Sequence, residues 1–309
     1  MTNDMSKIKT AIKQLKSDRG EFMASIVSNF FRWLPDATYL KLLYRFKMGH
    51  RLDLKNPQTF TEKLQWLKLY NRKQEYTTMV DKYAVKNYVA NIIGEEYIIP
   101  TLGVWDRFDD IDFSKLPQQF VLKTTHGGGG GGVVICRDKT TFNKEEAKSK
   151  LEASMHSDIY KSLREWPYKN VPKRIIAEKF MVDYSGELRD FKFYCFDGVP
   201  KVLLVASNRF TSHNYDYFDM DFNRLPITSV AGKNNYEIKE PPSNFEKMKK
   251  LVSILSKDFS HVRIDLYNCN GDIYFGEMTF YDSSGFDDMN SNEWNLRFGS
   301  WITLPSKIK

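Results

Sequence analysis

Six consecutive glycines at residues 127–132 separate two apolar, β-prone runs. The first run, residues 120–126, carries Lys123 near its end, and the second begins Val133-Val-Ile-Cys. Apolar runs on both flanks predict a glycine-tipped hairpin, with a flexible linker as the alternative. Glycine backbone can approach a phosphate closely and direct several N–H groups at it, while a lysine adds positive charge. We therefore expect a flap over nucleotide phosphates that is the least ordered part of the nucleotide-free protein.

Two other glycine-rich motifs fit this segment poorly. A P-loop requires Gly-Lys-Ser/Thr leading into a helix, and the dinucleotide-binding fingerprint also requires a helix after its glycines. Here the last glycine precedes the apolar run that starts at Val133. The interpretation that remains is a loop between two strands that covers phosphates.

Charge and cysteine usage exclude several classes of protein. The chain of 309 residues is long enough for about two lobes. Its three cysteines are scattered, which suits a reducing cytosol and argues against a disulfide framework or a zinc cluster. Residues 1–55 carry eleven Lys/Arg and five Asp/Glu, a net of +6 out of +7, so the remaining chain is close to neutral at +1. We therefore expect no nucleic-acid partner.

The basic N-terminal region has two apolar stripes at helical spacing: Ile8, Ile12 and Leu15, then Phe22, Ile26, Phe30 and Leu34. No apolar run reaches the length of a transmembrane helix, and the polar start does not resemble a signal peptide. We expect a cytoplasmic protein whose second stripe docks on its own core. The alternative is peripheral contact of residues 1–55 with the inner face of a membrane.

Helical and strand patterns alternate along the rest of the chain. Residues 60–92 have helical spacing, and Tyr97-Ile-Ile99 is strand-like. Capping boxes at Asn143/Glu146 and Ser243/Glu246 predict two helix starts. Strands are expected over 174–181, 189–196, 201–206, 262–267 and 272–278, with hairpin turns at Asp197-Gly198 and Asn270-Gly271. These patterns predict an α+β protein rich in antiparallel hairpins.

Asp265 and Glu277 lie on the two arms of the last predicted hairpin, among apolar neighbours. A turn at Asn270-Gly271 sets Asp265 opposite Gly276, which leaves Glu277 within one residue of facing it. Two carboxylates in an apolar setting repel unless a cation lies between them, and Mg²⁺ prefers carboxylate oxygens shared with nucleotide phosphates. We therefore expect a magnesium site, with solvated strand charges as the alternative.

Four further residues are candidates for this site. Thr279 shares a strand face with Glu277 and offers an oxygen ligand. Arg263, two residues before Asp265, is placed to stabilise a transferring phosphoryl group. Lys192 is a second candidate phosphate cation, with a surface strand lysine as the alternative. Glu178 ends an apolar strand and could accept hydrogen bonds from a nucleoside.

The order of these features is recognisable. It runs from Lys123 and the glycine hairpin through Glu178-Lys-Phe-Met181 and Glu187-x-x-Asp190-Phe-Lys192 to Arg263-x-Asp265 and Phe275-Gly-Glu277-Met-Thr279. This order resembles the ATP-grasp superfamily, and more closely its branch associated with teichuronopeptide and bacterial surface-polysaccharide biosynthesis, such as capsule. The segments 56–66 and 81–86 resemble that branch too. The resemblance covers about residues 45–305.

The resemblance implies an ATP-grasp fold in which two α+β lobes with antiparallel sheets hold ATP. The nucleotide-binding residues it implies are Lys123, Gly127, Gly128, Gly129, Gly130, Gly131, Gly132, Glu178, Lys179, Met181, Glu187 and Lys192. Adenine would meet Glu178 and the backbone through Met181, and the ribose would meet Glu187. Mg²⁺ would bind Asp265, Glu277 and Thr279. The catalytic residues would be Arg263, Lys192 and Lys123.

We divide the chain accordingly into a basic helical region (1–55), an N-terminal α/β subdomain (56–119), a small lobe with the flap (120–182) and a large lobe with the metal site (183–309). The sequence departs from many ATP-grasp enzymes at Thr279, where they have asparagine. The segment 281–285 is also more polar than the proline- or glycine-rich turn we would expect there.

The chemistry that the resemblance implies is ADP-forming carboxylate–amine ligation through an acyl phosphate. The expected substrates are a glycan uronic acid and an amino acid or amino sugar, and the oligomeric state is left open. One rival is a sugar-nucleotide glycosyltransferase, because Asp219-Met-Asp221 is a DxD triplet, although a turn after a strand is its plainer interpretation. A second rival is a non-catalytic membrane- or polymer-binding protein.

Overall fold

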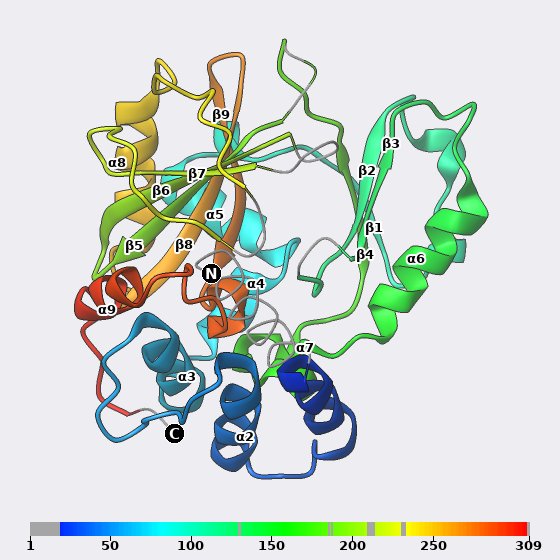
Figure 1. Cartoon of the computed structure of the whole chain (residues 1–309). Coiled ribbons are helices and arrows are strands. Elements are labelled where there is room, and N and C mark those ends of the chain that lie inside the picture. The colour runs from blue at the N-terminus through cyan, green and yellow to red at the C-terminus, as the bar shows by residue number, and fades with distance from the viewer. Residues whose placement is uncertain are drawn as a thin grey trace, which may run out of the picture.

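The computed structural model describes residues 19–128, 131–184, 186, 188–208, 214–229 and 233–307. It contains two antiparallel sheets in two lobes that face each other (Figure 1). The small-lobe sheet has the order β1-β4-β2-β3, with β1 at Thr101–Trp105, β2 at Phe120–Thr124, β3 at Val133–Cys136 and β4 at Ile175–Lys179. The large-lobe sheet has the order β7-β6-β5-β8-β9, with β5 at Asp190–Phe196, β6 at Val199–Ser207, β7 at Asn214–Phe218, β8 at His261–Cys269 and β9 at Asp272–Thr279. The α+β class with antiparallel sheets is confirmed.

The helices surround these two sheets. They are α2 (Asp36–Met48), α3 (Phe60–Tyr70), α4 (Glu75–Val80), α5 (Ala84–Ile93), α6 (Lys144–His156), α7 (Ile159–Leu163), α8 (Phe245–Ser256) and α9 (Asn292–Ser300). A further helix covers residues 19–30 of the described chain. None of the helices in the described ranges combines the length and the apolar character needed to cross a bilayer.

The glycine-tipped hairpin of the small lobe is confirmed by the pairing of β2 with β3, in which Lys123 lies opposite Val133. The alternating burial of β2 turns Phe120 and Leu122 into a core that also contains Leu151 of α6. Lys123 points to the other face, because side chains alternate along a strand. The predicted start of α6 is also confirmed, since the Asn143 side chain accepts a hydrogen bond from the Glu146 N–H.

The large lobe is held by the apolar residues of β5, β6 and β8. The amphipathic helix α8 buries Met248 and Val252 in this core. Phe298 of α9 meets Phe60 of α3 with ring centroids 5.4 Å apart. Both predicted hairpin turns form, with positive φ at Asp197-Gly198 (46° and 79°) and at Asn270-Gly271 (59° and 99°), as tight turns of this kind require.

Two local predictions were wrong. The residue before α8 is Asn244 and not Ser243, and its side chain does not cap the helix. Its amide nitrogen donates to the Gly271 carbonyl and its oxygen accepts from Asn268, so the side chain is committed to the β8–β9 hairpin. Tyr97 ends a 3₁₀ turn, and the strand begins only after Pro100, which has no N–H to give to a sheet.

The N-terminal helices form a third core, which contains Ala24 and Val27 of the first helix and Leu43 and Tyr44 of α2. The expected docking of the 22–34 stripe was wrong for Phe22 and Phe30, which are exposed, while Leu34 does pack on this core. The first stripe, residues 8–15, lies outside the described residues. The division into four domains stays a prediction, and β1, assigned to residues 56–119, pairs with β4 of the small lobe.

Candidate nucleotide and metal site

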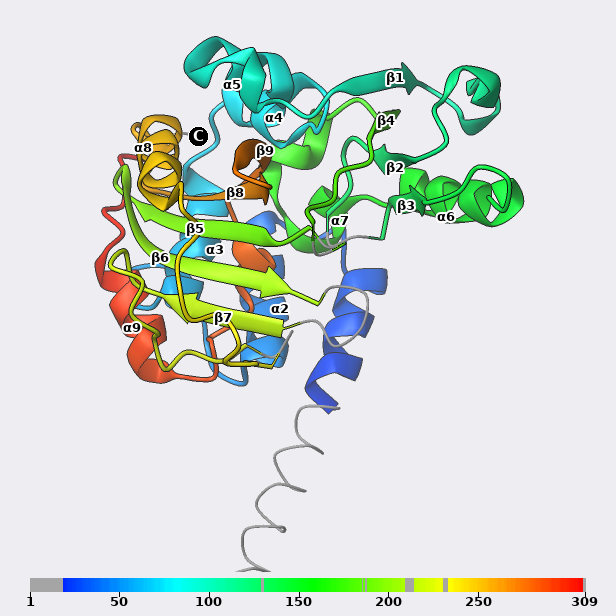
Figure 2. The ribbon, with the colours of Figure 1, turned by 90° about the horizontal axis from the view of Figure 1, so that it is seen from above.

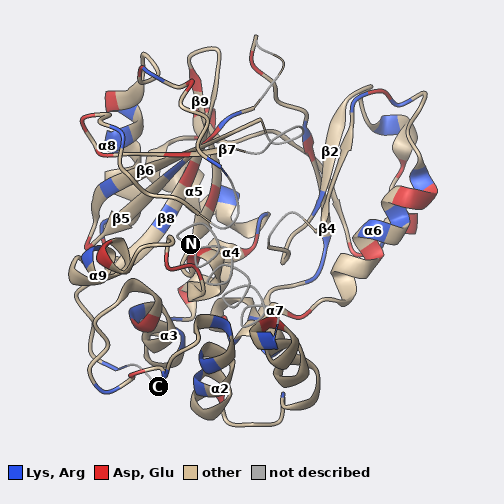
Figure 3. Ribbon diagram, viewed as in Figure 1, with Lys and Arg blue, Asp and Glu red and all other residues tan. Residues whose placement is uncertain are grey.

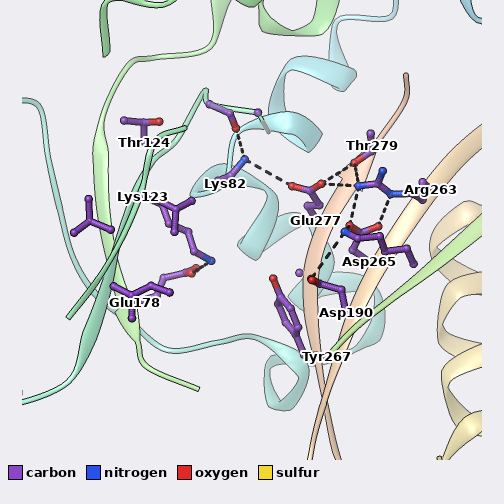
Figure 4. A pocket seen from close by; sticks show the side chains of 18 of the residues that line it. Lys82, Lys123, Thr124, Glu178, Asp190, Arg263, Asp265, Tyr267, Glu277 and Thr279 are labelled. Carbon is purple, nitrogen blue, oxygen red and sulfur yellow. Dashed lines mark hydrogen bonds and ion pairs between the residues drawn. The ribbon is translucent and has the colours of Figure 1, made fainter. Parts of the chain in front are cut away.

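A cleft of about 1350 Å³ lies between the two sheets. It brings together most of the predicted site residues: Lys123, Gly127, Gly128, Gly132, Glu178, Lys192, Arg263, Asp265, Glu277 and Thr279. Figure 4 labels six of them, namely Lys123, Glu178, Arg263, Asp265, Glu277 and Thr279. Lys179, Met181 and Gly131 are not among the residues that line it. Gly129, Gly130 and Glu187 lie outside the described residues, and so does the predicted mobility of the tip of the flap.

Three charged residues form a row across the large-lobe sheet. Lys192 of β5 pairs in register with Asp265 of β8, and Asp265 pairs with Glu277 of β9. Regular pairing around the Asn270-Gly271 turn would have placed Asp265 opposite Gly276, but a bulge between Asp265 and Leu266 shifts the register by one residue. The two carboxylates therefore face each other directly, closer than the sequence predicted.

Arg263 holds this carboxylate pair together. Its Nε donates to Asp265 Oδ1 at 2.7 Å, and its Nη2 lies 2.8 Å from Asp265 Oδ2 and 2.9 Å from Glu277 Oε1. The same Nη2 is 3.1 Å from Thr279 Oγ1, and Nη1 pairs with Asp282. Because arginine stays charged in any protein environment, it fixes both acids in place before any ligand arrives.

Lysines complete the charge balance of this wall. Lys192 pairs with Asp265 and lies 3.9 Å from Asp190. Lys82 lies 3.8 Å from Glu277 Oε2 and also donates to the Gly127 carbonyl, so it connects the large lobe to the glycine hairpin. Burial alone would raise the pKa of Glu277, but the positive charges of Lys82, Arg263 and Lys192 outweigh burial and lower it. Glu277 is therefore ionised across the physiological range, as a metal ligand must be.

The opposite wall, from the small lobe, is built around Glu178. Its Oε1 lies 2.5 Å from Lys86 Nζ and its Oε2 lies 2.6 Å from Lys123 Nζ. Burial raises the pKa of Glu178, yet the two ammonium groups more than compensate and lower it to about 2. Lys86 also donates to the Ile99 carbonyl at 2.6 Å. Glu178 thus holds the Lys123 ammonium group beside the point where β2 leads into the glycine segment.

The base of the glycine hairpin has no room for side chains. A Cβ added to Gly132 would lie 2.1 Å from Thr124 Oγ1 and 2.3 Å from Ser154 Oγ, and one added to Gly127 would lie 2.4 Å from Thr124 Oγ1. These two hydroxyls bond each other at 2.8 Å. Glycine is thus needed here for close approach to β2 and α6, whereas at Gly131 a Cβ would meet nothing within 4 Å.

The acidic pair fits Mg²⁺ better than a metal held by protein alone. Asp265, Glu277 and Thr279 supply only oxygen ligands, and the described ranges contain no group of three His, Cys, Asp or Glu side chains that could hold a metal. Mg²⁺ is usually held by one or two carboxylates together with substrate phosphates, which is what this site offers.

Sequence reasoning missed the roles of Lys82 and Lys86. Both belong to the 81–86 segment that had been noted only for its resemblance. Asp81 starts the segment by accepting the N–H groups of Tyr83 and Ala84 and by pairing with Arg174 at 2.7 Å. One sequence signal could have located them. Asp81 is suited to an Asx turn before a helix, and Lys82 and Lys86 follow it one helical turn apart.

The cleft is also lined by residues that the prediction did not include. Among them are Glu165, Tyr168 and Phe286. The buried Lys68 Nζ binds both the carbonyl and the hydroxyl of Ser284, at 2.8 and 2.7 Å. Burial lowers the pKa of Lys68 to about 7, although Glu165 acts in the opposite direction. These contacts fix the polar 281–285 turn in the wall of the cleft.

The DxD triplet forms a turn. Asp219 Oδ1 accepts the backbone N–H groups of Asp221 and Asn223 at 3.0 and 2.8 Å, and Oδ2 accepts from the Asn223 side chain. Neither aspartate is among the residues that line the cleft. This geometry supports the plainer interpretation of the triplet.

Comparison with known proteins identifies the family. The profile of the family described as TupA-like ATPgrasp matches residues 62–303. No curated protein matches the sequence significantly. Because the family profile covers well over half of the chain, membership rests on this match.

The solved structures to which the chain is similar are distant in sequence. D-alanine–D-alanine ligase from Bacillus anthracis is 19% identical with a TM-score of 0.40, and the match covers 66% of this chain and 57% of that one. The corresponding ligase from Helicobacter pylori is 13% identical with a TM-score of 0.42, covering 80% and 70%. The ADP complex of N5-carboxyaminoimidazole ribonucleotide synthetase is 15% identical with a TM-score of 0.44, covering 71% and 50%. By its profile match, the chain belongs to the TupA-like ATP-grasp family.

Proposed function

We propose that the protein is an ATP-dependent, ADP-forming carboxylate–amine ligase that works through an acyl phosphate. One observation carries the proposal. Lys123 and the glycine hairpin of one sheet face the Arg263-braced pair Asp265 and Glu277 of the other sheet across a single cleft. Phosphate-binding groups and metal ligands on opposite walls are what a nucleotide triphosphate requires. Membership in an ATP-grasp family supports the same reaction class.

The reaction has two steps. A substrate carboxylate oxygen attacks the γ-phosphorus of ATP, the bond to the β–γ bridging oxygen breaks, and ADP leaves. The amine of the second substrate then attacks the acyl carbon, the amine loses a proton, and phosphate leaves to give an amide. No nucleophilic side chain takes part, so the protein contributes positioning and charge.

The cations of the cleft have complementary roles in this scheme. Lys123 and Lys82 bind phosphate oxygens from the side of the glycine hairpin, and Lys192 and Arg263 stabilise the charge that develops on the transferring phosphoryl group. Each is already held by an acidic neighbour, so little reorganisation is needed when the charge develops. Asp265, Glu277 and Thr279 would hold Mg²⁺, which shields phosphate charge when it is bound.

The proposed substrates are a uronic acid of a bacterial surface glycan, such as a capsular polymer, and an amino acid or amino sugar. The resemblance to the teichuronopeptide branch supports this choice. The cleft is also lined by the aromatic residues Tyr168, Tyr215, Tyr217 and Phe286. Aromatic faces beside polar groups suit a sugar ring. We place the reaction in the cytoplasm, where ATP is available.

Screening ADP release with uronic acids paired against amino acids and amino sugars tests this proposal. We expect ADP release only when both substrates and Mg²⁺ are present, and an amide product by mass spectrometry. The variant Glu277→Gln serves as the inactive control. A glycosyltransferase would behave differently, because sugar nucleotides and not Mg-ATP would raise its melting temperature. That result would overturn the ligase assignment.

A further inference from the structure

The first helix of the described chain presents a second apolar surface that faces away from the core. Ala24 and Val27 pack inward. Phe22 and Phe30 are 66% and 72% exposed, and Trp33 in the turn that follows is 75% exposed. These three side chains are among the most exposed large apolar groups of the described residues, and we call them the aromatic surface. Large apolar side chains that are exposed on one short segment are typical of an interaction site.

The surroundings of the aromatic surface are basic. Residues 19–55 contain seven Lys/Arg and three Asp/Glu, a net of +4. Arg19, Arg32, Lys41 and Arg45 are exposed, and α2 shows its basic residues in Figure 3. The acids are already engaged: Glu21 pairs with Lys47 at 3.3 Å, and Asp36 pairs with Arg72 and Arg164 at 2.6 and 2.9 Å. The third acid, Asp53, accepts backbone N–H groups from Lys55 and Asn56.

The aromatic surface is attached firmly to the body of the protein. Arg164 Nη2 donates to the Arg32 carbonyl at 2.6 Å, and its guanidinium lies 3.9 Å above the ring of Tyr39. The next residue, Glu165, lines the cleft. Figure 2 shows the helix of residues 19–30, in dark blue, extending outward from the rest of the protein. A partner bound to the aromatic surface would therefore be connected to the wall of the cleft through Arg164 and Glu165.

We propose that the aromatic surface docks on an anionic lipid bilayer. Exposed Phe and Trp side chains with lysines and arginines beside them are the combination that interfacial segments use, with the rings at the headgroup level and the cations toward anionic lipid. An acidic protein partner would also satisfy the cations, and failure of the parent to bind vesicles would favour it. The inference does not rest on the proposed ligase activity, since it concerns a surface outside the cleft and vesicle binding is measured without ATP.

Co-sedimentation of the full chain with vesicles tests the inference. One set of vesicles contains phosphatidylcholine alone, and the other contains an equal mixture of phosphatidylcholine and phosphatidylglycerol. We expect binding to the mixed vesicles at low salt, little binding to phosphatidylcholine alone, and weaker binding at high salt, because added ions screen the attraction between charges.

The triple variant Phe22→Ser/Phe30→Ser/Trp33→Ser should bind the mixed vesicles about a thousandfold more weakly, since each of the three aromatic side chains is worth about tenfold in affinity when it is buried. The matched control is Tyr184→Ser/Ile254→Ser/Leu296→Ser, which removes large apolar side chains that are exposed elsewhere, at 93%, 51% and 42%. It should bind like the parent. The single variant Trp33→Ser removes one of the three rings and should weaken vesicle binding less than the triple variant does. Circular dichroism checks that each variant is folded.

Any of three results would overturn the inference. The first is a parent that fails to bind the mixed vesicles at low salt. The second is equal sedimentation of the parent and the triple variant. The third is an oligomer of the parent, seen by analytical ultracentrifugation, that the triple variant does not form, because the aromatic surface would then be an interface between copies of this chain.

Discussion

Asp265 of β8 and Glu277 of β9 are direct cross-strand neighbours because the chain inserts a bulge beside them. The residue at the bulge is Gly276, where an added Cβ would lie 3.0 Å from both the Asp265 carbonyl oxygen and the ring of Tyr267. A bulge re-aims side chains and is common beside active sites. The glycine thus allows the two carboxylates to point into the same part of the cleft, where Arg263 contacts both.

Replacing Glu277 with glutamine should remove the Mg²⁺-dependent part of ATP binding and lower ADP release by about a hundredfold or more, because one metal ligand and one charge are lost. Isothermal titration of ATP with and without Mg²⁺ measures the first effect without knowledge of the acceptor. Asp272→Asn, at the far end of the same strand, is the matched control and should behave like the parent. Unchanged Mg²⁺ dependence in Glu277→Gln would show that Glu277 does not bind the metal.

Replacing Lys82 with methionine should weaken ATP binding by about tenfold or more, because Lys82 joins the glycine hairpin to Glu277 and faces the space for phosphates. Methionine keeps most of the length of the side chain and removes only the charge. The control is Lys201→Met, since Lys201 is an exposed lysine on β6 away from the cleft. The KM for ATP and its equilibrium affinity are the quantities to compare, and an unaltered affinity would remove Lys82 from the phosphate site.

The features that the sequence alone predicts well are those decided by a few adjacent residues. The hairpins at Asp197-Gly198 and Asn270-Gly271 and the start of α6 at Asn143 were predictable, because backbone conformation there is decided by a few adjacent residues. The proximity of Asp265 and Glu277 was predictable from paired charge in apolar surroundings, while the roles of the site residues stay predictions. The pairing of Asp265 with Glu277 was predicted one residue out of register, because nothing in the periodicity reveals a bulge.

Long-range contacts explain what the sequence did not predict. In the sequence, Lys82 and Lys86 are simply two lysines near the start of a helix. Only the fold places Glu277 beside Lys82 and Glu178 beside Lys86. Phe22 and Phe30 matched a core-facing stripe at helical spacing, but spacing cannot say which of two apolar faces meets the core. The helix turned Ala24 and Val27 inward instead.

Replacing Glu178 with glutamine should destabilise the protein, because Lys86 would remain buried without its acidic partner. The loss is about 3–5 kcal/mol when one member of a buried ion pair is removed. The double variant Glu178→Gln/Lys86→Met should recover much of this loss, as a neutral pair requires no buried charge. Urea unfolding at neutral pH measures both, and equal stability of the single and double variants would argue against the pairing.

The same substitution has a pH signature. The pKa of Glu178 falls from an ordinary 4.5 to about 2 in the folded protein. A carboxyl with a depressed pKa stabilises the fold above its unfolded pKa and loses that contribution as pH falls toward the folded value. The stability difference between the parent and Glu178→Gln should therefore be constant above about pH 5 and shrink by about 3 kcal/mol toward pH 2. A difference that does not change over this range would contradict the assigned pKa.

Replacing Gly132 with alanine should lower the free energy of unfolding by about 1–3 kcal/mol, the usual cost of forcing extra atoms into a packed site. The new methyl group would displace the hydroxyls of Thr124 and Ser154, which bond each other at 2.8 Å and join the base of the hairpin to α6. Thr124 directly follows Lys123, so ATP affinity should fall as well. Gly131→Ala is a close control, because a Cβ there meets nothing within 4 Å and the stability should hardly change. Denaturant unfolding and the KM for ATP should be measured for both variants. If Gly132 mattered only because a glycine run is flexible, the two variants would show the same small effect, and that result would contradict a packing role for Gly132.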